Sequence, residues 1–431
     1  MTKIDWVRGD ALGLDFPAHA DALIAGGAAF LTRAFRASGM LSENNAVSCI
    51  NNAREVSGGS TGRKMLLVVD YKRPEPNLHN NLFVKFSRDF DNRRRDAAKV
   101  QMELEVRFAL LSQLPDFPVV VPACYFADFH VQTGTGILIT QCIPFGMDGV
   151  EPQYEKGLDH EMPDQLGHYQ ALIRALARLA GSHKAGRLGN TVERSFPFDP
   201  TKLTVSARAP YTPAQIGERV DDYIQLATEN PQLFPGALGT ETFFARLRDE
   251  APRFQSLSSR VITVLQSRPE MVALCHWNAH VDNAWFWRNA SGELTCGLMD
   301  WGNVSQMNVA VALWGCLSAA ELPIWNEHFD DLLTLFISEF ESCGGPLLCR
   351  KTLLRHLTLN VAMMGLAWML DSPKTMLAVQ PELAKAKSPR DALITSNEQV
   401  RSQLLILTAF LNLWERTDMN ALMHSLEHGC V

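Results

Sequence analysis

The chain has 431 residues, of which 46% are hydrophobic and 20% are charged. This length is too great for one ordinary domain, and the composition is sufficient to bury a large core, which excludes an intrinsically disordered protein. The formal net charge is −7, and acidic and basic residues are mixed along the sequence. This charge argues against nucleic acid as the main partner.

The cysteines and the N-terminal residues indicate the cellular compartment. The chain holds 9 cysteines, an odd number, without a repeated pair spacing, which favours a reducing environment. The first residues lack a basic start followed by an apolar stretch of signal length. The apolar run 360–370 is too short to cross a bilayer. We therefore expect a cytoplasmic protein with no membrane partner.

The first 143 residues predict a small α+β lobe. A helical lead-in is expected over the first 45 residues, with an Ala-rich stretch near residues 23–35. A helical pattern also covers residues 97–114, and prolines end it. Short runs rich in β-forming residues predict strands over residues 65–71, 82–86 and 136–141.

Residues 144–431 predict a mostly helical lobe. Apolar residues recur at a spacing of three to four, which is typical of helices that pack one face into a core. The expected helices cover residues 164–182, 330–340, 351–370 and 398–414. One non-helical segment, residues 272–301, interrupts this helical part.

This non-helical segment concentrates polar side chains that can hold a metal. Residues 275–286 read CHWNAHVDNAWF, and a turn at residues 289–292 leads to a second run that ends at Asp300. Two strands joined by such a turn would bring Asn283 and Asp300 to the same end of a hairpin. Amide and carboxylate oxygens are hard ligands that suit magnesium chelated by phosphates.

The segment resembles the loop of the aminoglycoside-phosphotransferase and choline-kinase-like families. Their pattern is His-Gly-Asp-x-His-x-x-Asn, followed by an apolar strand that ends in Ile-Asp-Trp. Here His276, His280 and Asn283 are in step, and Asp300-Trp301 ends the second element. The resemblance implies a bilobal protein-kinase-like fold with a small antiparallel-sheet N-lobe and a larger, mostly helical C-lobe. It also implies ATP or another nucleoside triphosphate and Mg²⁺ as cofactors, with Asn283 and Asp300 as metal ligands.

The two histidines of this loop, His276 and His280, also allow other interpretations. Each histidine alone is more often a satisfied core residue than a ligand. A zinc site lacks a third ligand at suitable spacing. By the resemblance, both histidines brace the loop through hydrogen bonds.

A glycine-containing turn precedes the first strong strand pattern. It includes Gly58, Gly59, Ser60 and Thr61. Glycines let the backbone approach phosphates closely, so that successive N–H groups can surround anionic oxygens. An ordinary hairpin is an equally good interpretation of the turn alone. The resemblance places it over the nucleotide.

Lys85 lies inside the apolar strand predicted for residues 82–86. A lone lysine in a strand usually points to solvent, but the resemblance implies contact with the α- and β-phosphates and a helix glutamate as its partner. Glu105 matches that glutamate best and Glu103 is the alternative, because residues two apart do not share one helix face. The backbone of Gln141 and Ile143 falls where the segment between the lobes would contact adenine.

One position departs from the family pattern. Asn278 stands where the catalytic aspartate is expected, and Trp277 replaces the preceding glycine. An amide cannot accept a proton, and general acid–base help is worth about 10²–10⁴-fold in rate. Phosphoryl transfer, however, depends mostly on positioning and charge neutralisation.

Three hypotheses for the activity remain open. The first is transfer of a γ-phosphoryl group to a hydroxyl of a small molecule, with Asn278 orienting the acceptor and Asp282 or solvent taking the proton. Asp282 alone is more often a solvated loop residue. The second is a nucleotide-binding pseudokinase, and the third is a kinase-fold enzyme that transfers a nucleotidyl group.

The acceptor is expected near the loop at Asn278 and the helices that follow Asp300. Large apolar side chains at helical spacing in this region are more often core than pocket. They are Met307, Trp314, Trp325, Met363, Met364, Trp368 and Met369. An acceptor bound by some of them would have an apolar portion. The sequence shows no dense carboxylate cluster of the kind a polycationic aminoglycoside requires.

Overall fold

The computed structural model describes residues 4–56, 61–200 and 211–428. The chain forms two compact units. Unit 1 comprises Met1–Val150, Asn190–Ser195 and Gly297–Val304, and unit 2 comprises Glu151–Gly189, Phe196–Cys296 and Ser305–Val431. The division differs from a single boundary after residue 143, because the short segment that carries Asp300 belongs to unit 1.

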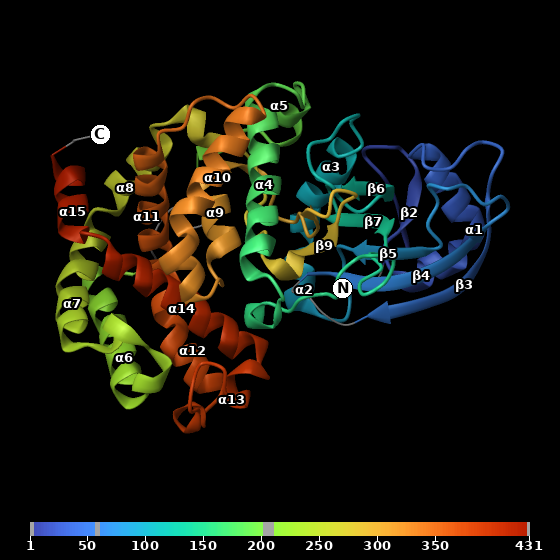
Figure 1. The fold of residues 1–431 in the computed structure, drawn as a ribbon. Coiled ribbons are helices and arrows are strands. Elements are labelled where there is room, and N and C mark those ends of the chain that lie inside the picture. Colours follow the sequence, from blue (N-terminus) through green and yellow to red (C-terminus); the bar gives the residue numbers. More distant parts are fainter. Residues whose placement is uncertain (1–3, 57–60, 201–210, 429–431) are drawn as a thin grey trace. The chain divides into compact units, whose positions relative to one another are not determined.

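Unit 1 contains a five-stranded antiparallel sheet with the order β3-β4-β5-β7-β6 (Figure 1). The bounds are β3 (Val47–Val56), β4 (Arg63–Tyr71), β5 (Asn81–Phe86), β6 (Cys124–His130) and β7 (Thr135–Gln141). Three of these strands match the runs predicted from the sequence. The predicted α+β architecture, with an antiparallel sheet and a larger helical part, is confirmed.

The strand β6 was not predicted, and its environment explains why. Six of its seven residues, from Cys124 to Phe129, are buried. Tyr125 and Phe126 belong to the apolar cluster that contains α1 (Ala20–Ala37). Ala127 and Phe129 belong to a second cluster with α3 (Met102–Leu111). A strand buried on both faces lacks the polar–apolar alternation that marks a half-buried strand.

The N-terminal region is only partly helical. Residues 6–17 contain a small antiparallel pair, β1 (Trp6–Arg8) and β2 (Asp15–Pro17), so the helical lead-in predicted for the first 45 residues is present only as α1. α1 begins after His19, whose ring accepts the N–H of Ala22. The remaining helices of unit 1 are α2 (Arg93–Ala97), α3 and α5 (Thr191–Ser195).

Unit 2 is mostly helical, and all four helices predicted for it are present (Figure 1). The first group is α4 (Gln165–Lys184), α6 (Pro213–Glu229), α7 (Glu241–Ser256), α8 (Ser258–Gln266) and α9 (Val309–Leu317). The second group is α10 (Phe329–Ser342), α11 (Arg350–Ala367), α12 (Ser372–Val379), α13 (Ala392–Thr395), α14 (Glu398–Arg416) and α15 (Met419–Glu427). Two short sheets interrupt the helices. They pair β8 (Val272–Cys275) with β11 (Ser305–Asn308), and β9 (Ala284–Arg288) with β10 (Leu294–Leu298).

The large apolar side chains that follow Asp300 mostly form core. Met307, Trp314, Trp325, Met363 and Met364 are all buried, which agrees with the core interpretation. One helical stretch of the described chain, Arg350–Val379, is long and apolar enough to span a membrane. Its most apolar window is 78% buried, which is typical of a core helix.

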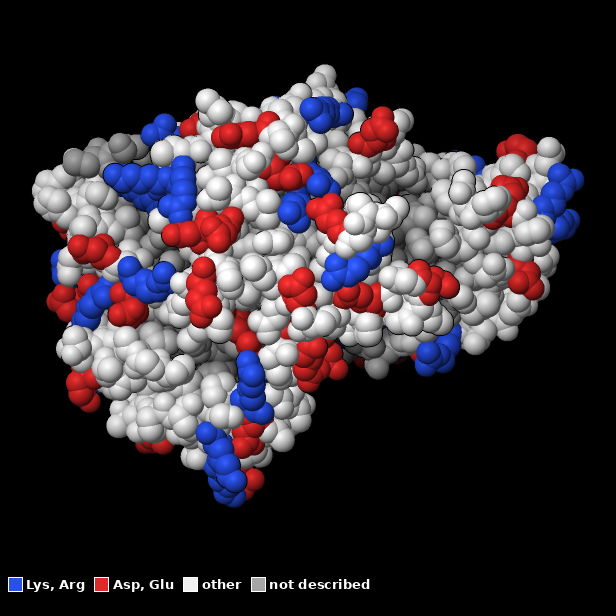
Figure 2. All heavy atoms as spheres, in the orientation of Figure 1, with Lys and Arg blue, Asp and Glu red and all other residues white. Residues whose placement is uncertain are grey.

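Charged side chains of both signs are scattered over the face drawn in Figure 2. Acidic and basic side chains of the described residues are intermixed there rather than gathered by sign.

The helix α9 supports the polar loop that follows β8. A Cβ atom at Gly315 would lie 1.7 Å from the carbonyl oxygen of Trp277, so the loop backbone rests directly on the helix at this glycine. Ser318, one turn further along, contacts the ring of His280 through its hydroxyl at 3.2 Å. The position of the loop therefore depends on a glycine in a helix, where glycine is otherwise unfavourable.

We expect the substitution Gly315→Ala to lower the free energy of unfolding by about 1–3 kcal/mol, because the added methyl group overlaps backbone that cannot move aside cheaply. Gly217→Ala is the matched control. It lies inside α6 with nothing within 4 Å of the added methyl group, so it should stabilise by roughly 0.5–1 kcal/mol. Urea denaturation of both variants measures the difference, and equal effects would contradict the proposed contact.

Candidate functional site

The loop between β8 and β9 is closed by its own hydrogen bonds. The backbone N–H of Asn278 donates to Nδ1 of His276 at 3.1 Å. Asn283 donates through Nδ2 to the backbone carbonyl of Asn278 at 2.8 Å. With its amide nitrogen engaged, Asn283 has its oxygen Oδ1 as the donor atom for a hard metal ion.

The two histidines of the loop are buried. His276 is 1% exposed and His280 is 4% exposed. Burial lowers the pKa of His280 well below its usual value, and the charges of Lys156 and His276 lower it further. The neutral ring of His280 shares a hydrogen bond with the hydroxyl of Ser318. In the part of the chain that the structure describes, neither histidine belongs to a group of three side chains that could hold a metal.

The second half of the predicted hairpin is also present. β9 and β10 pair, and Asn289 organises the turn between them by accepting N–H groups of Ser291 and Glu293 at 3.1 and 2.9 Å. Gly292 has a φ of +80°, which favours glycine. Two residues after β10 the chain reaches Asp300.

Three charged groups meet in unit 1. Nζ of Lys85 lies 2.6 Å from Oε1 of Glu105 and 3.0 Å from Oδ1 of Asp300. Burial by itself lowers the pKa of Lys85, but the charges of Glu105 and Asp300 and the hydrogen bonds to them raise it overall. These contacts favour the charged form of Lys85. Glu103 binds Arg107 instead.

The backbone at Asp300 is strained and held by its neighbour. Asp300 has a φ of +64°, in the left-handed region that a non-glycine residue occupies at a cost. The ring of Trp301 stacks on Phe108 of α3 with centroids 3.7 Å apart, and its indole N–H donates to the carbonyl of Leu298 at 3.0 Å. These contacts fix the backbone, and the Asp300 side chain remains 59% exposed. Such strain at an exposed carboxylate is typical of functional sites.

Lys64 is a further cation of this group that the sequence analysis missed. It lies opposite Lys85 in the β4–β5 pairing. Burial lowers the pKa of Lys64 and the charge of Lys85 lowers it further, while Asp300 and Glu105 oppose this. The signal in the sequence was a basic pair directly after the glycine-containing turn. Two lysines thus face the same carboxylates.

The glycine-containing turn is only partly described. Gly58, Gly59 and Ser60 lie outside the described residues, and Thr61 is half-buried two residues before β4. Gly62 has a φ of +51°, and a Cβ atom there would lie 1.8 Å from the carbonyl oxygen of Phe86. The turn therefore enters β4 through a position that only glycine suits.

The expected adenine-binding segment ends β7. Gln141 donates its backbone N–H to the carbonyl of Ala123 at 2.8 Å. The carbonyl of Ile143 accepts the N–H of Phe145 at 3.0 Å. Both groups are thus used within unit 1, and contact of this segment with adenine stays a prediction.

Asp282 lies in an acidic environment within unit 2. It is half-buried. The pKa of Asp159 is raised to about 7, mainly by burial. A hydrogen bond from Tyr169 lowers the pKa, and the nearby charges of Glu321 and Asp282 raise it. Asp282 is therefore close enough to Asp159 to influence its pKa. The sequence favoured a solvated loop residue at this position, whereas Asp282 is half-buried beside a second carboxyl group.

Asn283 and Asp300 belong to different compact units. Each has the oxygen chemistry of a magnesium ligand in its own surroundings. Their sharing of one ion stays a prediction.

Comparisons with known proteins give remote similarities. No protein-family profile and no curated protein matches the chain. Among solved structures, it is similar to choline kinase from Cryptosporidium parvum Iowa II, with 11% identity, a TM-score of 0.41 and coverage of 88% of this chain and 91% of that chain. A microcompartment-associated aminopropanol kinase has 14% identity and a TM-score of 0.40, covering 86% and 99%. A choline/ethanolamine kinase family protein from Mesorhizobium loti has 13% identity and a TM-score of 0.39, covering 88% and 93%.

Aminoglycoside and macrolide phosphotransferases are also among the structures matched. The neighbours are thus small-molecule phosphotransferases. At these identities and TM-scores, the similarities decide neither the activity nor the substrate of this chain.

We expect Glu105→Gln to weaken binding of magnesium–ATP and to lower the free energy of unfolding by about 1–3 kcal/mol, because the half-buried Lys85 loses one of its two charged partners. Glu103→Gln is the matched control, since Glu103 lies two residues away on the same helix and binds Arg107 instead. Calorimetric titration with a non-hydrolysable ATP analogue measures the affinities. Equal affinities in the two variants would contradict the role of Glu105.

Proposed function

We propose that this chain has a protein-kinase-like fold and transfers the γ-phosphoryl group of ATP, or of another nucleoside triphosphate, to a hydroxyl of a small molecule. The observation that supports this most is the group formed by Lys85, Glu105 and Asp300. A half-buried lysine held between two carboxylates is suited to binding phosphate oxygens. The exposed carboxylate of Asp300 is suited to a metal ion that accompanies them.

The residues present fit Mg²⁺. Asp300 offers an exposed carboxylate, and Asn283 offers an amide oxygen whose orientation is fixed by its bond to Asn278. Both are hard oxygen donors of the kind Mg²⁺ prefers beside phosphates. When bound, the ion would neutralise the negative charge of the phosphates. Lys85 would hold the phosphates in line, and Glu105 would keep Lys85 in place.

Asn278 determines how transfer would proceed. Its side-chain amide can orient an acceptor hydroxyl by a hydrogen bond but cannot take the proton. Asp282, four residues further along the same loop, is the nearest carboxylate in sequence and would receive it. Since transfer of this kind relies mainly on positioning and charge, we expect a slow but real activity.

The acceptor would bind in a cavity of unit 2. The cavity has a volume of about 290 Å³, and its walls are mostly apolar. Its one acidic side chain, Glu321, is bound by Arg390 at 3.0 Å. Asp159, which interacts with Asp282 of the loop, lies in the chain between two residues of the wall, Gly157 and His160. These features favour an acceptor with a substantial apolar part over a polycation.

A second candidate function is nucleotide binding without transfer. The observation that favours it is Asn278, which removes the usual base while Lys85, Asn283 and Asp300 are retained. A protein of this kind would bind magnesium–ATP with the same groups. Nucleotidyl transfer, the third hypothesis, would label the acceptor from the α-phosphate.

We expect Asp300→Ala to abolish the magnesium-dependent thermal stabilisation by ATP, because it removes both a metal ligand and a partner of Lys85. The matched control is Asp116→Ala, which replaces another exposed aspartate of unit 1 with a positive φ, +56°. Both variants bear the same backbone cost of alanine in that conformation. Thermal unfolding with and without Mg²⁺–ATP is the measurement, and unchanged stabilisation of Asp300→Ala would reject the role.

We expect Asn278→Asp to preserve the fold and to raise transfer, by up to about 10²–10⁴-fold if proton removal limits the rate. ADP formation with a panel of apolar alcohols and hydroxylated metabolites is measured for both proteins. Label from γ-³²P-ATP should appear on the acceptor, and label from α-³²P-ATP should not. A large fall in activity would show that the amide itself is required. Nucleotide binding without turnover in both proteins would favour the pseudokinase.

A further inference from the structure

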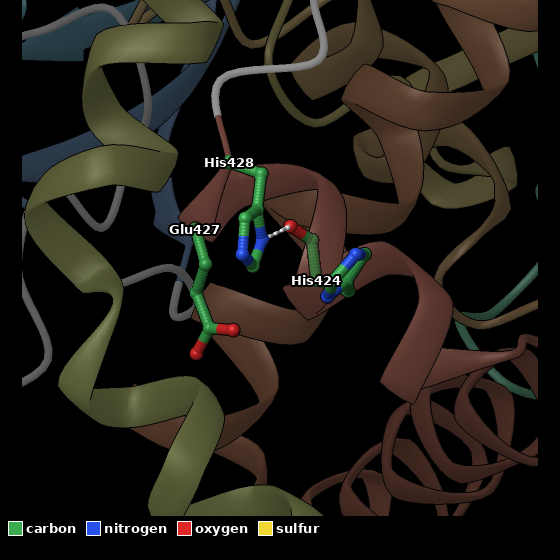
Figure 3. Close-up of side chains that lie close together, drawn as sticks. All are labelled: His424, Glu427 and His428. Atoms are coloured by element: carbon green, nitrogen blue, oxygen red, sulfur yellow. Dashed lines mark hydrogen bonds between the residues drawn. The ribbon is translucent and has the colours of Figure 1, made fainter.

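The end of α15 and the residue that follows it carry a group of side chains that could bind a metal and that the proposed function does not use. His424, Glu427 and His428 are all exposed, and their ligand atoms lie within 4.8 Å of one another (Figure 3). His424 and His428 are four residues apart, so they project from one face of the helix. Their rings are close, with centroids 4.0 Å apart.

The orientation of His428 is already set for a metal. Its Nδ1 lies 3.0 Å from the backbone carbonyl of His424, to which it donates (Figure 3). This bond places the proton on Nδ1 and leaves Nε2 with the lone pair that binds a metal. Histidine ligands of metals commonly use the second nitrogen in this way.

The charge around the group favours a cation in two respects and opposes it in one. The C-terminus of α15 carries the negative end of the helix dipole. Glu427 adds a carboxylate. Arg260 brings a positive charge nearby, but its guanidinium is bound to the backbone carbonyls of Leu426 and Glu427 at 3.2 and 2.8 Å. These bonds also fix the last turn of the helix.

We propose that His424, Glu427 and His428 form a surface site for a divalent transition metal such as Zn²⁺. Two imidazole nitrogens and one carboxylate oxygen select a borderline ion over Mg²⁺ or Ca²⁺, which prefer oxygen ligands. Metal–ligand distances of about 2.0–2.2 Å require the three atoms to approach by roughly an ångström, which exposed side chains can do by small rotations. A fourth position remains for water or for a donor from a partner.

The site is tested by calorimetric titration of the full chain with Zn²⁺. Every protein in the series carries Cys430→Ser, because a thiol two residues beyond His428 in the sequence would itself bind zinc. We expect one stoichiometric site that excess Mg²⁺ does not displace. His424→Gln and His428→Gln should each reduce the affinity by roughly tenfold or more, and Glu427→Gln should reduce it less. His328→Gln, at a histidine outside the group, is the matched control and should bind as before.

Equal zinc binding in the His424→Gln and His328→Gln variants would overturn the proposal, as would no binding in the Cys430→Ser background. His424, Glu427 and His428 are exposed, so their substitution is not expected to unfold the chain. Far-ultraviolet circular dichroism of each variant verifies this. The nucleotide site is not involved, so either result leaves the proposed phosphotransferase activity to its own tests.

Discussion

The charge of the half-buried Lys85 is the constraint on which the site in unit 1 depends. A cation in the middle of an apolar strand is costly unless charged partners surround it. Glu105 from α3 and Asp300 from a distant part of the sequence supply those partners. The segment near residue 300 accordingly lies beside the sheet in unit 1. Under the proposed function, this arrangement would bind anionic oxygens.

The loop between β8 and β9 in unit 2 is held by its own hydrogen bonds and by its contact with α9. It closes on itself through Asn278 and Asn283, and it lies on α9 where Gly315 leaves no side chain in the way. Burial keeps His280 neutral, so it can share a hydrogen bond without bringing an unpaired charge into the core. Under the proposed function, this loop would aim the amide of Asn278 at an acceptor. Phosphoryl transfer depends mostly on such positioning and on charge neutralisation.

The sequence predicted several elements with strong periodicity, but it missed a strand that burial conceals and also two long helices, α6 and α7. The helices around residues 164–182 and 398–414 were found because one face is apolar. The strand β6 was missed since it is buried on both faces, and α6 to α8 were not identified. Among site residues, the pairing of Lys85 with Glu105 rather than Glu103 agrees with the helix-face argument. The position of Lys64 opposite Lys85 depends on the strand register, which the basic pair in the sequence does not reveal by itself.

The sequence did not predict those parts of the site that depend on contacts between residues far apart in the chain. Spacing along the chain indicated that Asn283 and Asp300 flank a hairpin, and the two strands are present. Asp282 was expected to be solvated, yet it interacts with Asp159, which lies far away in the sequence. The cavity walls likewise come from segments that are distant in sequence, between Gly157 and Thr408. Contacts of this kind depend on how helices pack, which periodicity does not determine.

The most direct measurement is a crystal structure with Mg²⁺ and a non-hydrolysable ATP analogue. The account predicts one magnesium ion bound by Oδ1 of Asn283 and the carboxylate of Asp300, with Nζ of Lys85 on the α- and β-phosphates. A nucleotide bound elsewhere, or an ion that neither residue 283 nor residue 300 touches, would contradict it.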